Sequence, residues 1–168
     1  MQVLDIYILN VNKQKVKIFE CKNVKKYFFN MDLTSDDPKK VDEAIEESKA
    51  SKTDPFVAIC FYHTELPPSL FTASLFNKFR TNFTSDSVGK IFIVDASKNS
   101  QYAAKFGVIP TPAVVIIWKG NPLIIRRPGW DDCKKIIGCM HEEEWLSVLR
   151  FMAGIPKNEE RKFLSVNI

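Results

Sequence analysis

A continuous apolar run from Phe56 to Tyr62 constrains the fold of this chain more than any other feature. All seven residues of the run, Phe-Val-Ala-Ile-Cys-Phe-Tyr, are apolar or aromatic. A strand with one face in water alternates apolar and polar residues, so an unbroken run indicates a strand buried on both faces, as in sheets covered by helices on either side. A second run of this kind, Lys90 to Asp95, follows after one helical pattern. The two runs predict the centre of an α/β sheet.

Helical patterns lie before, between and after these two runs. An Asp-Asp-Pro sequence at residues 36–38 is typical of a helix start, and apolar residues follow it at helical spacing. The next helix begins near Pro67, and its expected buried stripe repeats at every fourth residue: Phe71, Leu75, Phe79 and Phe83. A short helix at residues 99–106 ends at Gly107, a residue type favoured at helix C-termini.

The C-terminal part of the pattern predicts two strands and a helix. Ala113 to Trp118 and Leu123 to Arg126 flank a turn, which indicates a β-hairpin. A final helix starts with acidic residues after His141 and ends before Pro156. The order β-α-β-α-β-β-α predicts a three-layer α/β fold, in which a mixed central sheet has helices on both faces.

The N-terminus carries a separate β pattern. Val3 to Leu9 and Val16 to Phe19 are rich in β-forming residues and predict a β-hairpin extension. We therefore expect an extension at residues 1–35, a domain at residues 36–155 and a charged C-terminal tail at residues 156–168. A chain of 168 residues agrees with one such domain.

Charge and cysteine content argue against several classes of protein. The chain has 24 Lys and Arg residues against 20 Asp and Glu, and this net charge of +4 is too small and too dispersed to indicate nucleic-acid binding. A basic stretch at residues 13–26 is expected to be a solvated face, with phosphate binding as the alternative. The four cysteines form no Cys-x-x-Cys pair, which argues against a zinc finger and for a reducing compartment. Because residues 1–10 lack a leader pattern and no apolar run has membrane-spanning length, we expect a nuclear or cytoplasmic protein.

The segment from Asp95 to Gly120 resembles thioredoxin. In thioredoxins a glycine ends a helix five residues before a cis-proline, and a turn glycine follows eight residues after it; Gly107, Pro112 and Gly120 have both spacings. The resemblance implies a thioredoxin-like fold with a cis peptide bond before Pro112, because cis bonds are almost restricted to proline. Pro110 is the rival position for that bond.

The same alignment places Leu66-Pro67-Pro68-Ser69 where thioredoxins have their redox Cys-x-x-Cys. That chemistry needs a reactive thiolate and a second, resolving thiol, and neither Leu66 nor Ser69 supplies one. Cys60 stands where thioredoxins have a buried aspartate that relays protons, and burial makes a thiol inert. We therefore expect a protein without redox activity, not an enzyme, and with no cofactor.

A narrower resemblance, over residues 40–168, is to the Dim family of spliceosomal thioredoxin-like proteins. It rests on Val41 to Ile45 in the first helix, on Phe61 and His63 before the active-site remnant, on an insertion at residues 129–140 and on a C-terminal extension. In that family a cysteine stands at the position of Ser69 and an acidic residue at that of Leu66. The resemblance implies a subunit of a splicing ribonucleoprotein that binds protein partners and meets RNA only indirectly.

The thioredoxin resemblance also implies where a partner binds. In thioredoxins the active-site loop and the cis-proline loop form a groove for extended peptides. The residues expected to line this groove are His63, Glu65, Leu66, Pro67, Pro68, Ser69, Ile109, Thr111 and Pro112. Trp130 in the insertion is a second candidate interface, because exposed Trp often dominates interfaces, and packing over the last strand is the alternative.

Other polar side chains have simpler explanations. His63 has no second ligand at a metal-binding spacing, so we expect no metal site. Ser69 is expected to accept a backbone hydrogen bond at a helix N-terminus rather than to act as a nucleophile. Cys133 and Cys139 are expected to remain thiols, and whether they ever pair stays open. Two alternatives to a partner-binding module also stay open: a thiol-dependent oxidoreductase or glutathione-linked enzyme that uses Cys60 or another cysteine, and a chaperone-like peptide-binding thioredoxin domain.

Overall fold

The computed structural model describes residues 5–11, 14–20, 33–51, 56–83 and 90–166, and the chain divides into two compact units, Met1–Asp32 and Leu33–Ile168. In the first unit β1 (Asp5–Val11) pairs antiparallel with β2 (Gln14–Glu20), which confirms the predicted hairpin. The first residues of the predicted hairpin, and the predicted extension from residue 21 to residue 32, lie outside the described residues.

The second unit starts three residues before the predicted domain boundary. Its first residues run beside an edge strand, where the Asp36 N–H donates to the Ile93 carbonyl at 2.8 Å. The Ser35 hydroxyl accepts a hydrogen bond from the Asp95 N–H at 3.0 Å. Residues 33–35 therefore belong to the α/β domain, because Leu33 packs against its core and Ser35 completes the hydrogen bonding of β4.

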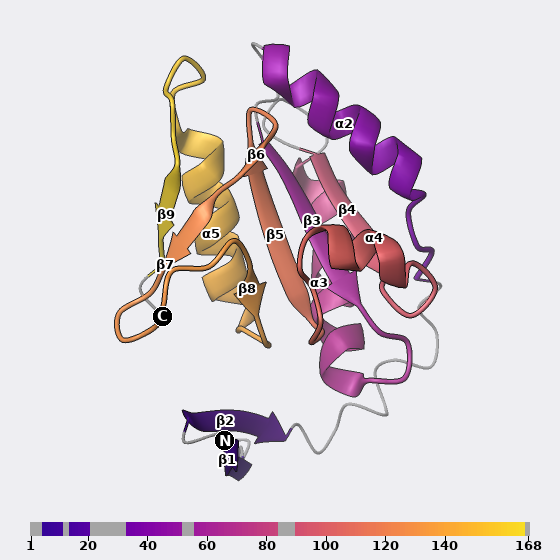
Figure 1. The fold of residues 1–168 in the computed structure, drawn as a ribbon, viewed down its shortest axis with the longest axis vertical. Coiled ribbons are helices and arrows are strands. Elements are labelled where there is room, and N and C mark those ends of the chain that lie inside the picture. Colours follow the sequence, from indigo (N-terminus) through magenta and orange to yellow (C-terminus); the bar gives the residue numbers. More distant parts are fainter. Residues whose placement is uncertain (1–4, 12–13, 21–32, 52–55, 84–89, 167–168) are drawn as a thin grey trace. The chain divides into compact units, whose positions relative to one another are not determined.

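The described part of the α/β domain contains eleven elements, which form a mixed central sheet, a small second sheet and the surrounding helices (Figure 1). In chain order they are α2 (Pro38–Ala50), β3 (Phe56–Tyr62), α3 (Pro67–Phe83), β4 (Lys90–Asp95), α4 (Ser100–Lys105), β5 (Ala113–Trp118), β6 (Asn121–Pro122), β7 (Ile124–Arg126), β8 (Ile136–Ile137), α5 (Glu142–Gly154) and β9 (Phe163–Ser165). The central sheet has the order β4-β3-β5-β6, with β8 also paired to β5. Strand β3 is parallel to β4 and antiparallel to β5. The predicted mixed sheet is confirmed.

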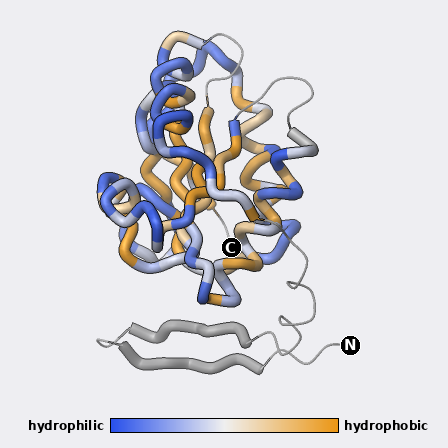
Figure 2. The backbone as a smooth tube through the Cα atoms, turned by 90° about the vertical axis from the view of Figure 1, so that its right-hand side faces the viewer, coloured by the Kyte–Doolittle hydropathy of each residue, from blue (hydrophilic) through white to orange (hydrophobic). Residues whose placement is uncertain are grey.

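Helices cover both faces of this sheet, as predicted. The side chains of β3 alternate between the two faces, and every residue of β3 is buried. One face packs against α2 and α4 through Val41, Ala44 and Ala103. The other packs against α3 and α5, where the Phe76 ring meets the Trp145 ring edge-on at a centroid distance of 5.0 Å. Figure 2 shows the hydrophobic strands between two helical layers whose outer turns are largely hydrophilic.

The predicted aromatic stripe of α3 is correct only in part. Leu75 and Phe79 are buried, but Phe71 is 36% exposed and Phe76 is fully buried instead. A helix has about 3.6 residues per turn, so a stripe at every fourth residue drifts around the helix and leaves the core face. No described helix, including the 17-residue α3, combines the length and the apolar character that crossing a membrane requires.

The C-terminal third differs from the prediction in two ways. The predicted hairpin is shorter than expected, because β5 pairs in this way only with the two-residue strand β6. A two-residue loop with positive φ at Lys119 and Gly120 joins the two strands, as in hairpin turns whose backbone matches the strand twist. Beyond Leu123 the chain leaves β5, and β7 pairs in parallel with β9. The predicted charged tail therefore contains a strand, and its Leu164 and Val166 are buried against the α3 and α5 core.

The insertion at residues 129–140 folds back onto the domain. Its strand β8 pairs with the first residues of β5, so that Ile136 lies opposite Val114 and Ile137 opposite Ala113. Gly138 N–H donates to the Pro112 carbonyl at 2.9 Å. The insertion thus occupies the half of the β5 edge that β6 leaves open.

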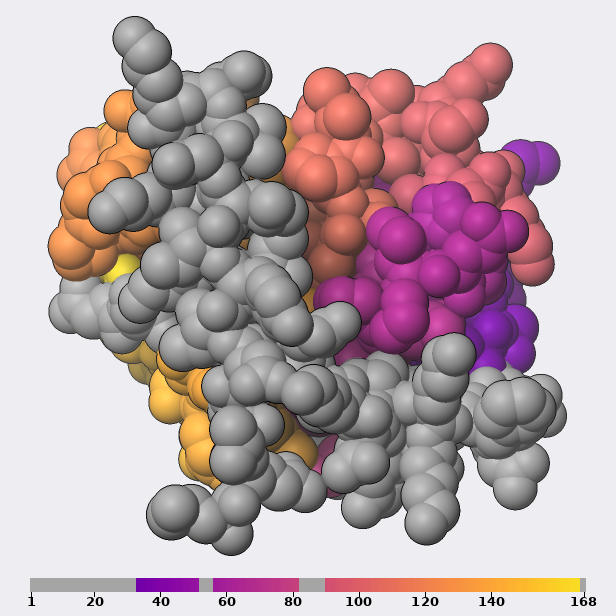
Figure 3. All heavy atoms as spheres, turned by 90° about the horizontal axis from the view of Figure 1, so that it is seen from below, coloured from indigo at the N-terminus to yellow at the C-terminus, as the bar shows by residue number. Residues whose placement is uncertain are grey.

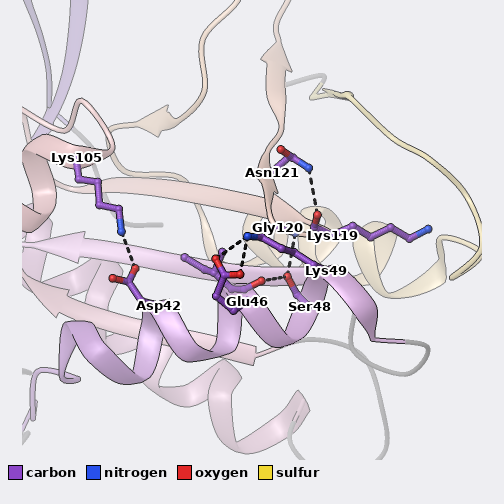
Figure 4. Close-up of polar contacts among 9 residues, drawn as sticks. Asp42, Glu46, Ser48, Lys49, Lys105, Lys119, Gly120 and Asn121 are labelled. Carbon is purple, nitrogen blue, oxygen red and sulfur yellow. Dashed lines mark hydrogen bonds and ion pairs between the residues drawn. The ribbon is translucent and has the colours of Figure 1, made fainter.

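Side-chain contacts hold α2 to its neighbours (Figure 4). Asp37 caps the helix by accepting a hydrogen bond from the Lys39 N–H at 3.0 Å, and Pro38 takes the first helical position. The Ser48 hydroxyl accepts from the Gly120 N–H at 3.0 Å, and Lys105 lies 2.9 Å from the Asp42 carboxylate. These contacts tie α2 to the β5–β6 turn and to α4.

Candidate functional site

The loop after β3 forms a compact turn that leads into α3. The Leu66 N–H donates to the His63 carbonyl at 3.2 Å, and the Glu65 N–H donates to His63 Nδ1 at 3.2 Å. Pro67 and Pro68 follow as the first residues of α3, where a missing N–H leaves no gap in the helix. His63 is half-buried, whereas Glu65, Leu66 and both prolines are exposed.

A second loop, before β5, lies beside this turn. The peptide bond between Thr111 and Pro112 is cis, which selects Pro112 over Pro110 as the special position. Pairing of Phe61 with Ala113 in the sheet brings the two loops together at the same edge. Figure 3 shows the segment after residue 60, in magenta, next to the segment before residue 113, in salmon.

Leu66 and Ile109 stand out on these two loops because they are apolar and exposed. Leu66 is 43% exposed and Ile109 is 92% exposed. We call seven residues of the two loops the loop surface: His63 and Thr111, which are half-buried, and Glu65, Leu66, Pro67, Pro68 and Ile109, which are exposed. Two of the nine residues predicted to line a groove do not take part, because Pro112 and Ser69 are buried.

Ser69 does not have the predicted capping role. It is the third residue of α3, it is fully buried, and its hydroxyl oxygen has no hydrogen-bond partner in the described part of the chain. The turn from His63 to Leu66 already leads the backbone into the helix. Ser69, which the sequence resemblance aligns with the second thiol of thioredoxins, is therefore closed to solvent.

The structure brings Cys139 to the start of α3, which no sequence pattern indicated. Its thiol donates to the Pro68 carbonyl at 3.1 Å and lies 3.5 Å from the Thr72 hydroxyl. Burial raises the pKa of Cys139, and the hydrogen bond with Thr72 opposes that shift in part. Cys139 and Pro68 are 71 residues apart in the chain, so only the folding of the insertion places them together.

The other two described cysteines are also thiols. Cys60 is fully buried in β3 between Ile93 of β4 and Val114 of β5. Burial raises the pKa of Cys60, and the neighbouring Cys139 raises it further. Cys133 donates to the Lys135 carbonyl at 2.7 Å and forms no disulfide with Cys139. Cys60 thus remains protonated at neutral pH, and solvent does not reach it.

Trp130 lies on the surface of the insertion. Its side chain is 65% exposed, and the Arg127 guanidinium lies 5.9 Å from the centroid of its ring. The alternative that Trp130 packs over the last strand is therefore wrong. Within residues 33–51, 56–83 and 90–166, no group of three His, Cys, Asp or Glu side chains is arranged to hold a metal ion.

Comparison with known proteins shows the fold of this chain. The sequence matches no protein-family model and no curated protein. The structure is similar to a thioredoxin variant from Halobacterium salinarum, with a TM-score of 0.50 and 16% identity over 73% of this chain and 89% of that one. The chain has a thioredoxin-like fold. A thioredoxin from Nicotiana alata has the same TM-score of 0.50 and 16% identity, over 68% of this chain and 86% of that one. In this thioredoxin-like fold, the loop surface corresponds to the region in which the predicted groove was placed.

Proposed function

We propose that this chain is a thioredoxin-like protein-interaction module without redox activity, and that it acts as a subunit of a larger assembly. The exposure of Leu66 and Ile109 on adjacent loops carries this proposal. Apolar side chains that are exposed next to each other often mark interaction sites. Extended peptides bind at the equivalent loops of thioredoxins, so a protein segment is the expected ligand.

The state of the thiols supports a role without redox chemistry. Disulfide exchange starts from an accessible thiolate and is completed by a second thiol. Leu66 and Ser69 have no sulfur, Cys60 is buried, and the pKa values of both Cys60 and Cys139 are raised. Neither Cys60 nor Cys139 therefore combines exposure with a lowered pKa.

A reduction assay tests the redox part of the proposal. We expect the purified chain to reduce insulin with thioredoxin reductase or dithiothreitol no faster than the buffer control. The variants Cys60→Ser and Cys139→Ser are expected to behave in the same way. Turnover that disappears in either variant would support the alternative, a thiol-dependent oxidoreductase.

The identity of the assembly is proposed from the sequence resemblance to the Dim family. That resemblance favours a splicing ribonucleoprotein in which the chain contacts protein partners, with RNA contact only indirect. Affinity purification of the tagged chain from nuclear extract should recover splicing proteins together with spliceosomal RNA. Recovery of neither would contradict the splicing role while leaving a different assembly open.

Charged substitutions test whether the loop surface binds the partner. We expect Leu66→Asp combined with Ile109→Asp to lower partner recovery by about tenfold or more, since buried interface anchors dominate affinity. The matched control is Ala50→Asp, because Ala50 is exposed at the end of α2 that leads to the start of β3, away from the loop surface. Equal recovery with all three proteins would refute the site. Binding to many unfolded proteins would favour the chaperone-like alternative.

A further inference from the structure

Strand β9 has an outer edge that is open for strand pairing. Its inner edge is bonded to β7, because the Ile124 N–H donates to the Lys162 carbonyl and the Val166 N–H donates to the Arg126 carbonyl, both at 2.9 Å. In a parallel ladder alternate residues face each side, so the N–H and C=O groups of Phe163 and Ser165 point away from β7. No hydrogen bond from the described residues reaches these groups. Figure 1 shows β9 as the outermost strand of this small sheet, in front of α5.

Two exposed phenylalanines flank the open edge. Phe163 of β9 is 38% exposed, and the Arg126 guanidinium lies 3.6 Å from the centroid of its ring. Phe151 of α5 is 49% exposed, and the Arg161 guanidinium lies 5.1 Å from the centroid of its ring. Arg161 precedes Phe163 by two residues, so this flank of α5 lies beside the start of β9. An added strand would have an aromatic ring available near each of its two faces.

Positive charge is available beside the edge. Three carboxylates of the neighbouring segments are occupied in ion pairs: Glu159 with Arg161 at 2.6 Å, Glu160 with Lys119 at 3.2 Å and Asp132 with Arg126 at 3.2 Å. In the described part of the chain, Arg150, which precedes Phe151, and Lys162, which precedes Phe163, have no ion-pair partner. An edge flanked by uncompensated cations repels basic segments and attracts acidic ones.

We propose that the outer edge of β9 binds an extended acidic segment of a partner protein by strand addition. Main-chain hydrogen bonds to Phe163 and Ser165 hold the segment, its apolar side chains contact Phe163 and Phe151, and its carboxylates meet Arg150 and Lys162. This surface shares no residue with the loop surface, so the proposal stands or fails independently of the proposed function. The predicted interface at Trp130 is also separate from it.

Selection of peptides from a random displayed library against the intact chain tests the proposal. We expect enriched peptides to alternate apolar and acidic residues and to bind with an affinity that falls as salt is added. In NMR spectra, such a peptide should shift the backbone amide signals of Phe163 and Ser165 more than those of Leu66 and Ile109. Failure to enrich any peptide, or enrichment of basic ones, would overturn the proposal.

Substitutions at the edge separate strand pairing from general attraction. Ser165→Pro removes the outward N–H and leaves the bonds of Leu164 and Val166 to β7 in place, so peptide affinity should fall about tenfold, as expected for one lost hydrogen bond. The matched control, Ser165→Ala, keeps that N–H and should bind like the original chain. Arg150→Glu combined with Lys162→Glu should weaken binding at low salt and leave the circular dichroism spectrum unchanged.

Other outcomes assign the edge to a different occupant. If Ser165→Pro does not fold, the charge-reversed variant alone decides, and unchanged acidic-peptide binding by it would refute the proposal. If Ser165→Pro folds and binds as well as Ser165→Ala, the segment does not pair with β9. Concentration-dependent dimers that Ser165→Pro abolishes would show that a second copy of the chain, rather than a partner, covers the edge.

Discussion

Asp36 forms hydrogen bonds with β4, which is an edge strand of the central sheet. Removal of the Asp36 side chain should lower the free energy of unfolding by about 2–4 kcal/mol. Its carboxylate accepts a hydrogen bond from the Ile93 N–H at 2.7 Å and lies 2.8 Å from the Arg80 guanidinium. The side chains of Asp36 and Arg80 are only 20% and 29% exposed. One side chain therefore satisfies a backbone group of β4 and a cation of α3 at the same time.

The magnitude follows from these two contacts. A hydrogen bond to a charged group contributes about 1.5–3 kcal/mol, and Asp36→Ala leaves the N–H of fully buried Ile93 without an acceptor. The ion pair with Arg80 adds up to about 1 kcal/mol, because solvent still screens it in part. Asp36→Asn keeps an acceptor for Ile93 and loses the charge, so it should cost about half as much.

Urea unfolding followed by tryptophan fluorescence measures this effect, since Trp118 and Trp145 are both buried. The matched control is Asp37→Ala, which removes an exposed helix cap and should cost about 1 kcal/mol. A double-mutant cycle with Arg80→Met should give a coupling energy of up to about 1 kcal/mol. If Asp36→Ala costs no more than Asp37→Ala, the account of the β4 edge is wrong.

Three further predictions concern a titration, a turn and the C-terminal strand. Burial, and next the hydrogen bond to Asp42, raise the pKa of Tyr102. The protonated Tyr102 therefore contributes stability that is fully present below a pH of about 10 and is lost as the pH rises above that value. Tyr102→Phe should flatten this alkaline decline of the unfolding free energy, and an unchanged decline would contradict the prediction. Gly120 has a φ of 77°, and a Cβ there would lie 2.3 Å from Lys49 Cγ. Gly120→Ala should therefore lower the free energy of unfolding in urea by about 1–2 kcal/mol. A neutral effect would show that the turn tolerates a side chain. Leu164→Ala should cost about 2–5 kcal/mol because Leu164 is buried in the main core, whereas a loss below about 0.5 kcal/mol would show that β9 does not stabilise the domain.

The layered core could be predicted because its signals are local. Seven consecutive apolar residues can be buried only between two layers, so Phe56 to Tyr62 had to become an inner strand. The start of α2 at Pro38 and the end of α4 before Gly107 follow from backbone preferences of single residues. These features need no knowledge of distant parts of the chain.

The candidate site could be predicted only as a set of neighbouring loops. Spacing from Gly107 and Gly120 singled out Pro112, and the pairing of Phe61 with Ala113 then brought the loop before β5 beside the loop after β3. Spacing does not report exposure, so it could not distinguish Ile109 on the surface from Ser69 in the core. The burial of Ser69 depends on which side of α3 packs against the core, and that is decided by the fold.

Residue type and local spacing were enough to predict the order of the helices and of the central strands, and they show that Leu66 and Ser69 carry no thiol. Long-range packing is what makes the tail form β9, brings Cys139 of the insertion to Pro68 and leaves an open strand edge beside Phe163. The short strand β9 has a weak local signal, and it forms because burial of Leu164 and pairing with β7 across a long stretch of chain outweigh local preference.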